Sequence, residues 1–224
     1  MTVTGIILVA GNSTRFRKNS NKNFEKINDK YIFEYSLEQF LENSNITNII
    51  IAAKKEEFEF INNVIHKKNG NPINLIEGGT TRQESVYNCI TKTNSDIVII
   101  HDGARPVIKQ EYINNCIKEM KYYDGATIAV KSKDTIKISD DNNIVTATTE
   151  RKNTWIIQTP QCFRRETLLK AHEKFKNNQT ITDDCMLIEL LGKQVKLIEG
   201  DYTNIKITTP DDINLIKEFL KKST

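Results

Sequence analysis

The chain has 224 residues, of which 38% are hydrophobic and 27% are charged, and its formal net charge is +3. This length suggests one large domain or two small ones, with enough apolar residues for a core. The net charge is too small to indicate a nucleic-acid-binding protein by itself, and the four cysteines form no CxxC pair, which argues against a zinc ribbon or a disulfide framework.

The first 130 residues alternate between apolar strands and amphipathic helices. The run at 3–10 is continuously apolar, as in a strand buried on both faces, and is too short for a signal peptide or a membrane span, so we expect a cytoplasmic protein. Further strands are predicted at 46–54, 72–79, 95–106 and 125–132, and helices at 32–43, 56–68, 82–93 and 110–123. This alternation predicts an α/β fold: a Rossmann-like, mostly parallel sheet with helices on both faces.

The alternation breaks at 131–160, where short β-like runs flank the turn-forming sequence DDNN. We expect a β-arm here, inserted at about 131–157 into one domain that spans 1–224. Regular alternation then resumes, with helices predicted at 164–176, 182–192 and 210–222 and strands at 194–200 and 204–209. Thr182 or Asp183 is the expected N-cap of the second of these helices.

Sheets of this kind bind ligands outside the carboxyl ends of their strands, and the first loop there is 10–22. It lacks both the GxGxxG spacing of a dinucleotide site and the GxxxxGK[ST] of a Walker A loop. What remains is a turn at Gly11 whose backbone amides can hold a phosphate or a base edge, with Arg15 and Lys22 placed to wrap around it. A solvated surface turn with exposed basic residues is an equal alternative.

The second such loop, 78–85, begins with paired glycines, which let a ligand approach the backbone closely. Arg82 and Ser85 fall on the first turn of the following helix, whose N-terminus favours an anion or a polar group. Taken alone, the stretch also fits a plain glycine turn followed by a helix cap.

The third loop, 101–106, follows a strand that carries no charge until Asp102. A carboxylate there, beside Arg105, suits a divalent metal that binds phosphates, although a structural Asp–Arg pair would look the same. His101 is expected to be packed or hydrogen-bonded rather than a metal ligand. Lys206, within the predicted strand 204–209, either points into a cleft or lies outward on an edge.

In order and spacing, these motifs resemble the 2-C-methyl-D-erythritol 4-phosphate cytidylyltransferase family of isoprenoid precursor synthesis. The resemblance runs nearly end to end, through the stretches LVAGNSTRF, EGGTTRQESV, VIIHDGARP, AVKSKDTIK, ERKNTWIIQTPQCF, TDDCMLIE and EGDYTNIKITTPDDI. It implies the nucleotidyltransferase fold and transfer of CMP from CTP to methylerythritol phosphate, with release of pyrophosphate. A magnesium ion is implied as the cofactor.

The resemblance also implies roles for particular residues. The implied catalytic cations are Arg15, Lys22 and Lys206, and the nucleotide would be bound by Ala10, Gly11, Asn12, Gly78, Gly79 and Ser85. The acceptor would be bound by Asp102, Arg105, Thr135, Arg151, Thr159 and Thr182, with Asp102 also on the metal. Thr135 and Arg151 match arm residues that reach the partner's site, so the resemblance implies a homodimer formed through the arm.

Several other functions remain open on the sequence alone. The nearest is a ribitol-5-phosphate cytidylyltransferase, which has the same fold and chemistry, and a sugar nucleotidyltransferase using UTP is more distant. A nucleic-acid-binding module would gather basic and aromatic residues on one face, whereas the lysines here are spread widely around a single Trp155. A nicotinamide-linked oxidoreductase lacks its glycines. We therefore expect neither nucleic acid nor membrane among the partners.

Overall fold

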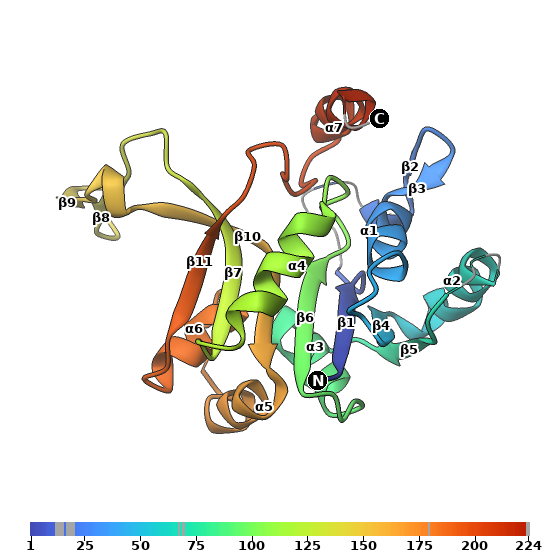
Figure 1. Cartoon of the computed structure of the whole chain (residues 1–224). Helices are drawn as coiled ribbons and strands as arrows, with labels where there is room; N and C mark the ends of the chain where they lie inside the picture. The colour runs from blue at the N-terminus through green and yellow to red at the C-terminus, as the bar shows by residue number, and fades with distance from the viewer. Residues whose placement is uncertain (12–15, 17–20, 67, 69, 179, 223–224) are drawn as a thin grey trace.

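A computed structural model describes residues 1–11, 16, 21–66, 68, 70–178 and 180–222. Within them lies a seven-stranded sheet in the order β11-β7-β10-β6-β1-β4-β5 (Figure 1). Its strands are β1 (Val3–Leu8), β4 (Asn48–Ala53), β5 (Ile73–Glu77), β6 (Ile97–Asp102), β7 (Gly125–Lys131), β10 (Trp155–Arg164) and β11 (Val195–Glu199). Only β10 runs antiparallel to its neighbours, which confirms the predicted mostly parallel sheet.

Helices cover both faces of this sheet, as predicted. They are α1 (Ile32–Leu41), α2 (Phe58–Ile65), α3 (Arg82–Ile90), α4 (Gln110–Glu119), α5 (Arg165–Lys174), α6 (Asp184–Leu190) and α7 (Asp211–Lys222). Successive side chains of a strand point to opposite faces, so Ile7 of β1 joins the core under α1 and α4 while Ile6 joins the core under α3, α5 and α6. The continuous apolar run of β1 thus fills two cores at once.

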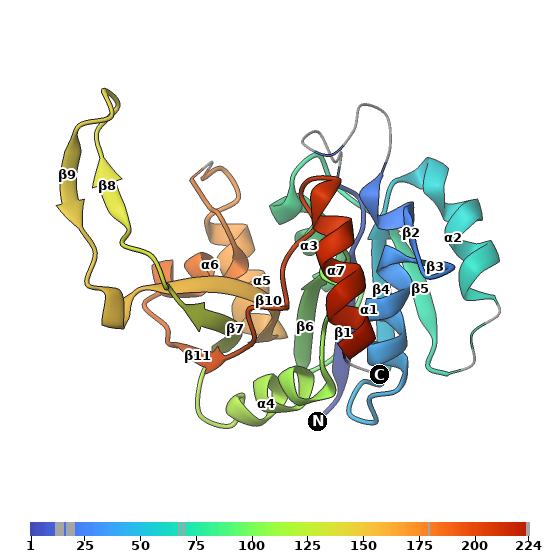
Figure 2. The same ribbon diagram turned by 90° about the horizontal axis from the view of Figure 1, so that it is seen from above.

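Helix α7 packs through a small apolar cluster over the carboxyl ends of the strands (Figures 1 and 2). Ile216 of α7 packs there with Ala104 and Ile207. Short elements complete the fold around the first loop and the arm: the hairpin strands β2 (Lys26–Ile27) and β3 (Lys30–Tyr31), and the 3₁₀ turns η1 (Lys22–Phe24), η2 (Lys55–Glu57) and η3 (Arg151–Asn153).

The predicted hairpin around DDNN is present and projects from the body of the molecule (Figure 2). It pairs β8 (Lys137–Ser139) with β9 (Val145–Thr148) in antiparallel fashion. In its turn the backbone N–H of Asp140 donates to the carbonyl of Ile144 at 3.0 Å, and Asn143 adopts a left-handed φ of 63°. Asn tolerates this conformation better than most residues, so the DDNN signal had a physical basis.

Two sequence predictions were wrong in detail, and a third left two alternatives between which the structure decides. The segment 204–209 is not a strand, because its backbone pairs with the turn after β6 rather than with a strand, the N–H of Ile207 donating to the carbonyl of Ala104. Trp155–Arg164 is a central strand of the sheet, whereas we assigned its first residues to the arm and its last to a helix. Of the two candidate N-caps for α6, Asp183 serves: its Oδ1 accepts from the backbone N–H of Met186 at 3.1 Å.

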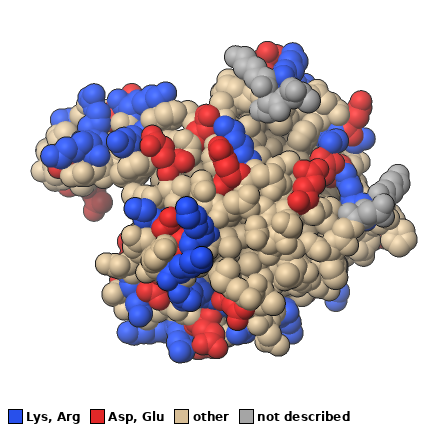
Figure 3. Space-filling model, in the orientation of Figure 1, with Lys and Arg blue, Asp and Glu red and all other residues tan. Residues whose placement is uncertain are grey.

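Charges of both signs are interspersed on the surface. On the face drawn in Figure 3, Lys and Arg side chains are numerous on the arm and over the lower part of the body, with Asp and Glu side chains among them. In the described part of the chain, no helix has the length and apolar character needed to cross a membrane.

Candidate active site

A cavity of about 620 Å³ opens at the carboxyl ends of β1, β5 and β6. Strand β4 lies on one side of β1 and β6 on the other, so the strand order reverses at β1. Open α/β sheets bind ligands at such a reversal. The three predicted loops meet here, and the cavity is lined by Ala10, Gly11, Lys22, Gly78, Gly79, Ser85, Asp102 and Lys206 from the sequence-predicted set. Among the described lining residues, four are basic and two are acidic.

The glycine loop forms one wall of the cavity. A side chain at Gly78 would collide with Cβ of Ala10 and come within 3.1 Å of Oγ of Ser85, so glycine is what allows the first two loops to approach. Oγ of Ser85 accepts from the backbone N–H of Gly79 at 3.0 Å and donates to the carbonyl of Thr81 at 2.9 Å. This narrow wall is therefore made largely of backbone atoms, and the hydrogen bonds of Ser85 hold it rigidly.

Helix α3 begins at this wall with a capping box. Oγ1 of Thr81 accepts from the backbone N–H of Glu84 at 3.1 Å, and Oε2 of Glu84 accepts from the backbone N–H of Thr81 at 3.3 Å and from that of Thr80 at 2.7 Å. Hydrogen bonds from the hydroxyl and the backbone N–H of Thr80 lower the pKa of Glu84, which keeps the carboxylate ionised in this role. The first turn is thus fixed, and with it the point from which Arg82 leaves the helix.

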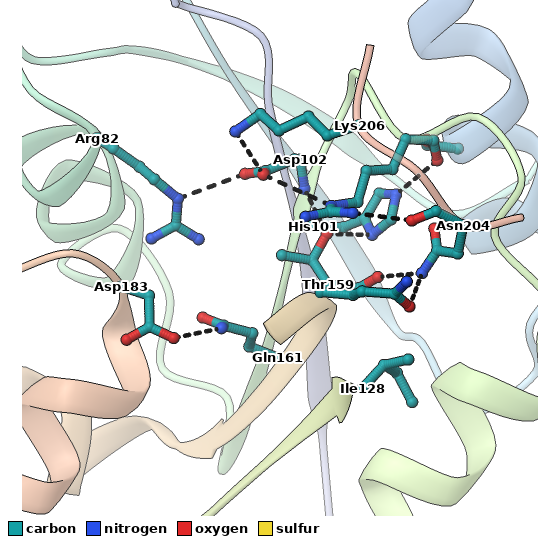
Figure 4. A network of polar contacts seen from close by, with 12 residues as sticks. Arg82, His101, Asp102, Ile128, Thr159, Gln161, Asp183, Asn204 and Lys206 are labelled. Atoms are coloured by element: carbon teal, nitrogen blue, oxygen red, sulfur yellow. Dashed lines mark hydrogen bonds and ion pairs between the residues drawn. The ribbon is translucent and has the colours of Figure 1, made fainter. Parts of the chain in front are cut away.

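Three cations surround Asp102 at the end of β6. Nζ of Lys206 lies 2.7 Å from its Oδ2, while Nε of Arg82 lies 3.4 Å from Oδ1 and Nε of Arg105 lies 3.9 Å from Oδ2 (Figure 4). Burial alone would raise the pKa of Asp102, but the charges of Lys206, Arg82 and Arg105 outweigh it and hold this pKa well below its usual range. The cluster therefore pairs one fixed anion with an excess of positive charge.

A neutral histidine supports the turn behind Asp102. The hydroxyl oxygen of Thr159 accepts from the backbone N–H of Asp102 at 3.1 Å, so the hydroxyl can donate to Nδ1 of His101 at 2.9 Å. Nε2 of His101 then donates to the carbonyl of Arg105 at 3.1 Å. Burial lowers the pKa of His101 to about 4, in keeping with this neutral form. The prediction of a packed, hydrogen-bonded histidine is confirmed.

The segment that carries Lys206 is held without being a strand. Nη1 of Arg105 donates to the carbonyl of Asn204 at 2.8 Å, and Nδ2 of Asn204 donates to the carbonyl of Thr159 at 2.9 Å. The backbone N–H of Ile207 donates to the carbonyl of Ala104 at 2.9 Å. Arg105 and Thr159 thus lie behind the cavity and fix the turn from which Lys206 extends.

Three other sequence-predicted residues, Thr135, Arg151 and Thr182, are not brought to the cavity of this chain. On the arm, Nη2 of Arg151 donates to Oγ1 of Thr135 at 2.9 Å, and both residues are exposed. Thr182 is exposed just before α6. Asn12 and Arg15 lie outside the described residues.

Two cations of the cavity wall were not among the predicted site residues. Lys54 directly follows β4, whose carboxyl end lies beside that of β1, so the rule that picked out the other loops could have found it. Arg82 was recognised on a helix first turn, but its contact with Asp102 depends on two loops meeting and has no local signal.

The described residues fit a magnesium ion only if substrate phosphates supply some of its ligands. Within the described ranges, no group of three His, Cys, Asp or Glu side chains could hold a metal. Magnesium is commonly bound through one or two carboxylates together with substrate phosphates. Asp102 meets that requirement, since it is ionised and lines the cavity. The acidic residue Glu84 is already engaged in the capping box.

Comparison with known sequences finds relatives of one family over nearly the whole chain. The sequence model of the 2-C-methyl-D-erythritol 4-phosphate cytidylyltransferase family matches residues 3–222. A relative of that name from Caldanaerobacter subterraneus is 44% identical over 227 residues, covering 99% of this chain and 100% of the relative. Another from Clostridioides difficile is 42% identical over 219 residues, covering 96% and 92%.

Solved structures lead to the same group. The crystal structure of 4-diphosphocytidyl-2C-methyl-D-erythritol synthase from Anaerococcus prevotii superimposes with a TM-score of 0.88 at 31% identity, covering 98% of both chains. That of the 2-C-methyl-D-erythritol 4-phosphate cytidylyltransferase from Francisella tularensis gives 0.81 at 29% identity, covering both chains completely. With a full-length sequence match and a fold that agrees over the same span, the chain belongs to the 2-C-methyl-D-erythritol 4-phosphate cytidylyltransferase family.

Proposed function

We propose that the protein transfers CMP from CTP to 2-C-methyl-D-erythritol 4-phosphate and releases pyrophosphate. The observation that carries the proposal is the cavity itself, which joins a narrow backbone wall to cations gathered around Asp102. A pyrimidine edge suits the first feature and a triphosphate suits the second. Family membership selects methylerythritol phosphate over ribitol phosphate as the acceptor.

The narrow wall supports a role in reading the base. Its polar groups are the backbone amides and carbonyls near Ala10, Gly11, Gly78 and Gly79, together with the hydroxyl of Ser85. These groups are held rigidly, so they can distinguish the donor and acceptor pattern of cytosine without long side chains. Asn12 belongs to the same proposal, although it lies outside the described residues.

The chemistry follows from charge. An oxygen of the acceptor phosphate attacks the α-phosphorus of CTP, a new P–O bond forms, and the bond to the bridging oxygen breaks as pyrophosphate leaves. Both reactants are anions, so Lys22 and Lys206, with Arg15, reduce their repulsion and stabilise the charge of the transition state. The acceptor phosphate is already ionised and nucleophilic at neutral pH, so the chain need only position it.

A magnesium ion belongs to the proposal through Asp102. When bound, such an ion polarises phosphoryl oxygens and offsets developing negative charge. Asp102 would hold it together with the nucleotide phosphates, and Lys206 would then pass from Asp102 to those phosphates. The low pKa of Asp102 supports this role, because the carboxylate is ionised at neutral pH.

The acceptor and the arm complete the proposal. Thr182 would bind the acceptor from this chain, while Arg105 and Thr159 would act from behind the cavity by holding the turns that carry Asp102 and Lys206. Thr135 and Arg151 would bind the acceptor from a partner, in a homodimer formed through the arm at 131–157. Exposed apolar residues on the hairpin support the second part: Ile138 is 51% exposed and Ile144 is 64% exposed. A two-stranded hairpin with so much apolar surface needs a covering surface.

Replacing Ile138 and Ile144 together by Asp is expected to convert a dimer into a monomer, because two charges would have to be buried in the contact. Sedimentation velocity measures this directly. Turnover should fall with dimerisation, since each site would lose the partner's arm. Tyr122→Ser, which removes a large side chain on the body that is 73% exposed, is the control and should remain dimeric. A monomeric wild-type protein with full turnover would contradict the arm proposal.

The function itself is tested by pyrophosphate release with CTP and magnesium, using methylerythritol phosphate in one assay and ribitol 5-phosphate in the other. Turnover with the first acceptor only is expected. Turnover with the second only would keep the fold and the chemistry but change the acceptor. Absence of turnover with both would overturn the proposal.

A further inference from the structure

Arg82 is held from behind by a second carboxylate. Its Nη1 donates to Oδ2 of Asp184 at 2.6 Å, whereas its Nε lies 3.4 Å from Oδ1 of Asp102. Both bonds are charge-assisted, and the shorter one is the stronger, so Asp184 holds the guanidinium more firmly than Asp102 does. Asp184 is the first residue of α6, 102 positions further along the chain, and it connects that helix to the cavity wall.

Asp184 is itself fixed on both oxygens. Its other oxygen, Oδ1, lies 3.2 Å from Nε2 of His172 on α5, and both side chains are only 1% exposed. Burial opposes the charge of Asp184, but Arg82 and the hydrogen bond from His172 outweigh it and lower the pKa of this carboxyl. A buried charge without partners would be strongly unfavourable, so the three side chains form one interdependent unit.

Arg82 retains capacity to bind a ligand. A guanidinium has five N–H donors, and the bonds to Asp102 and Asp184 employ two of them. Its side chain is 28% exposed and lines the cavity. A long side chain at a cavity wall would otherwise sample several rotamers, and ordering it on binding would be unfavourable. The anchor removes that freedom before a ligand arrives.

We infer that Asp184, braced by His172, is a positioning residue that holds the guanidinium of Arg82 at the cavity wall to bind a phosphate group of the nucleotide. Neither Asp184 nor His172 is among the described residues that line the cavity, so both would act through Arg82. The identity of the ligand rests on the proposed function. The chemistry requires only a polyphosphate, which allows the inference to be tested apart from turnover.

A double-mutant cycle tests it, with Arg82→Ala, Asp184→Asn and the two combined. Asp184→Asn keeps the shape and removes the charge that anchors the guanidinium. Each single change is expected to lower kcat/KM for CTP about 10- to 100-fold, as displaced binding groups do. The combined variant should be no worse than Arg82→Ala alone. Losses that multiply, or an Asp184→Asn variant equal to wild type, would overturn the inference.

Binding of pyrophosphate with magnesium, measured by calorimetry on the same proteins, gives a readout without turnover. The same non-additive pattern is expected. If the wild-type protein binds pyrophosphate but turns over neither acceptor, the proposed function fails. The pyrophosphate affinities of the variants would still test the inference in that case. Additive losses of affinity would overturn the inference even where turnover is normal.

Two further variants separate positioning from folding. Thr93→Val removes a buried hydrogen bond at the amino end of the sheet, in which Oγ1 of Thr93 lies 2.8 Å from Oγ1 of Thr4. This variant should lower the melting temperature without changing pyrophosphate binding. Should Asp184→Asn not fold, His172→Gln loosens the same anchor more gently. It should weaken binding in the wild-type background and have no effect in the Arg82→Ala background. Equal weakening in both backgrounds would overturn the inference.

Discussion

Replacing Lys206 by Met is expected to lower kcat about 10²- to 10³-fold, the usual effect of removing one charge that stabilises a transition state. Met preserves much of the length and apolar character of the side chain, so the change is mainly the loss of the ammonium group, which lies 2.7 Å from Asp102 at the cavity. Steady-state kinetics with CTP and methylerythritol phosphate measures the effect.

The KM for CTP should change much less than kcat in this variant, because Lys22, Lys54 and Arg82 remain in the cavity to bind the triphosphate. An interaction made mainly in the transition state is recognised by this split. Lys193→Met, which removes a 52% exposed lysine just before β11, is the matched control and should leave kcat unchanged. A Lys206→Met variant within threefold of wild-type kcat would contradict the proposed role.

Asp102→Asn is also expected to reduce turnover, by about 10²-fold or more. It should in addition change how the activity responds to magnesium. Because the pKa of Asp102 lies well below its usual range, the substitution removes a full negative charge at neutral pH. Activity should then show little dependence on the magnesium concentration. Titration with magnesium at fixed CTP measures this.

The same variant should bind pyrophosphate more tightly than wild type when no metal is present. The charges of Lys206, Arg82 and Arg105 would no longer be offset by a carboxylate, so a polyanion would meet a more positive site. Weaker binding without metal, together with an unchanged magnesium response, would show that Asp102 only stabilises the turn. Calorimetry with and without a chelator distinguishes the two results.

Much of the fold could be predicted because the sequence is locally consistent. Buried strands such as β1 lie in continuously apolar runs and the helices between them are amphipathic, so the period and the length of the runs both indicated a parallel sheet. Trp155–Arg164 was missed because a polar Gln158 and a proline interrupt its apolar run. Its Gln158 is satisfied by tertiary contacts, with Nε2 donating to the carbonyl of Asp201 at 3.0 Å. Such contacts are invisible to local pattern.

The site was predictable in part, for a geometric reason. The carboxyl ends of the strands of a parallel sheet lie at one edge, so the loops that carry Gly11, Gly78 and Asp102 could be placed at that edge from the alternation of strands and helices. The anchor of Arg82 could not be foreseen, since Asp184 and His172 lie on two later helices and carry no signal at the level of spacing. Residues that act through another side chain are found only when packing is known.

The ion pairing at Asp102 also bears on selectivity among the anions of a cell. A small anion such as inorganic phosphate gains little by entering, because Lys206 and Arg82 already have a carboxylate partner that it would have to replace. On the proposed function, a polyphosphate accompanied by a metal ion would gain more, since the metal would neutralise Asp102 while the cations bound the phosphates. The carboxylate of Asp102 would then compete with small anions for the cations, which would disfavour abundant monophosphates at this position and favour the metal-bound nucleotide.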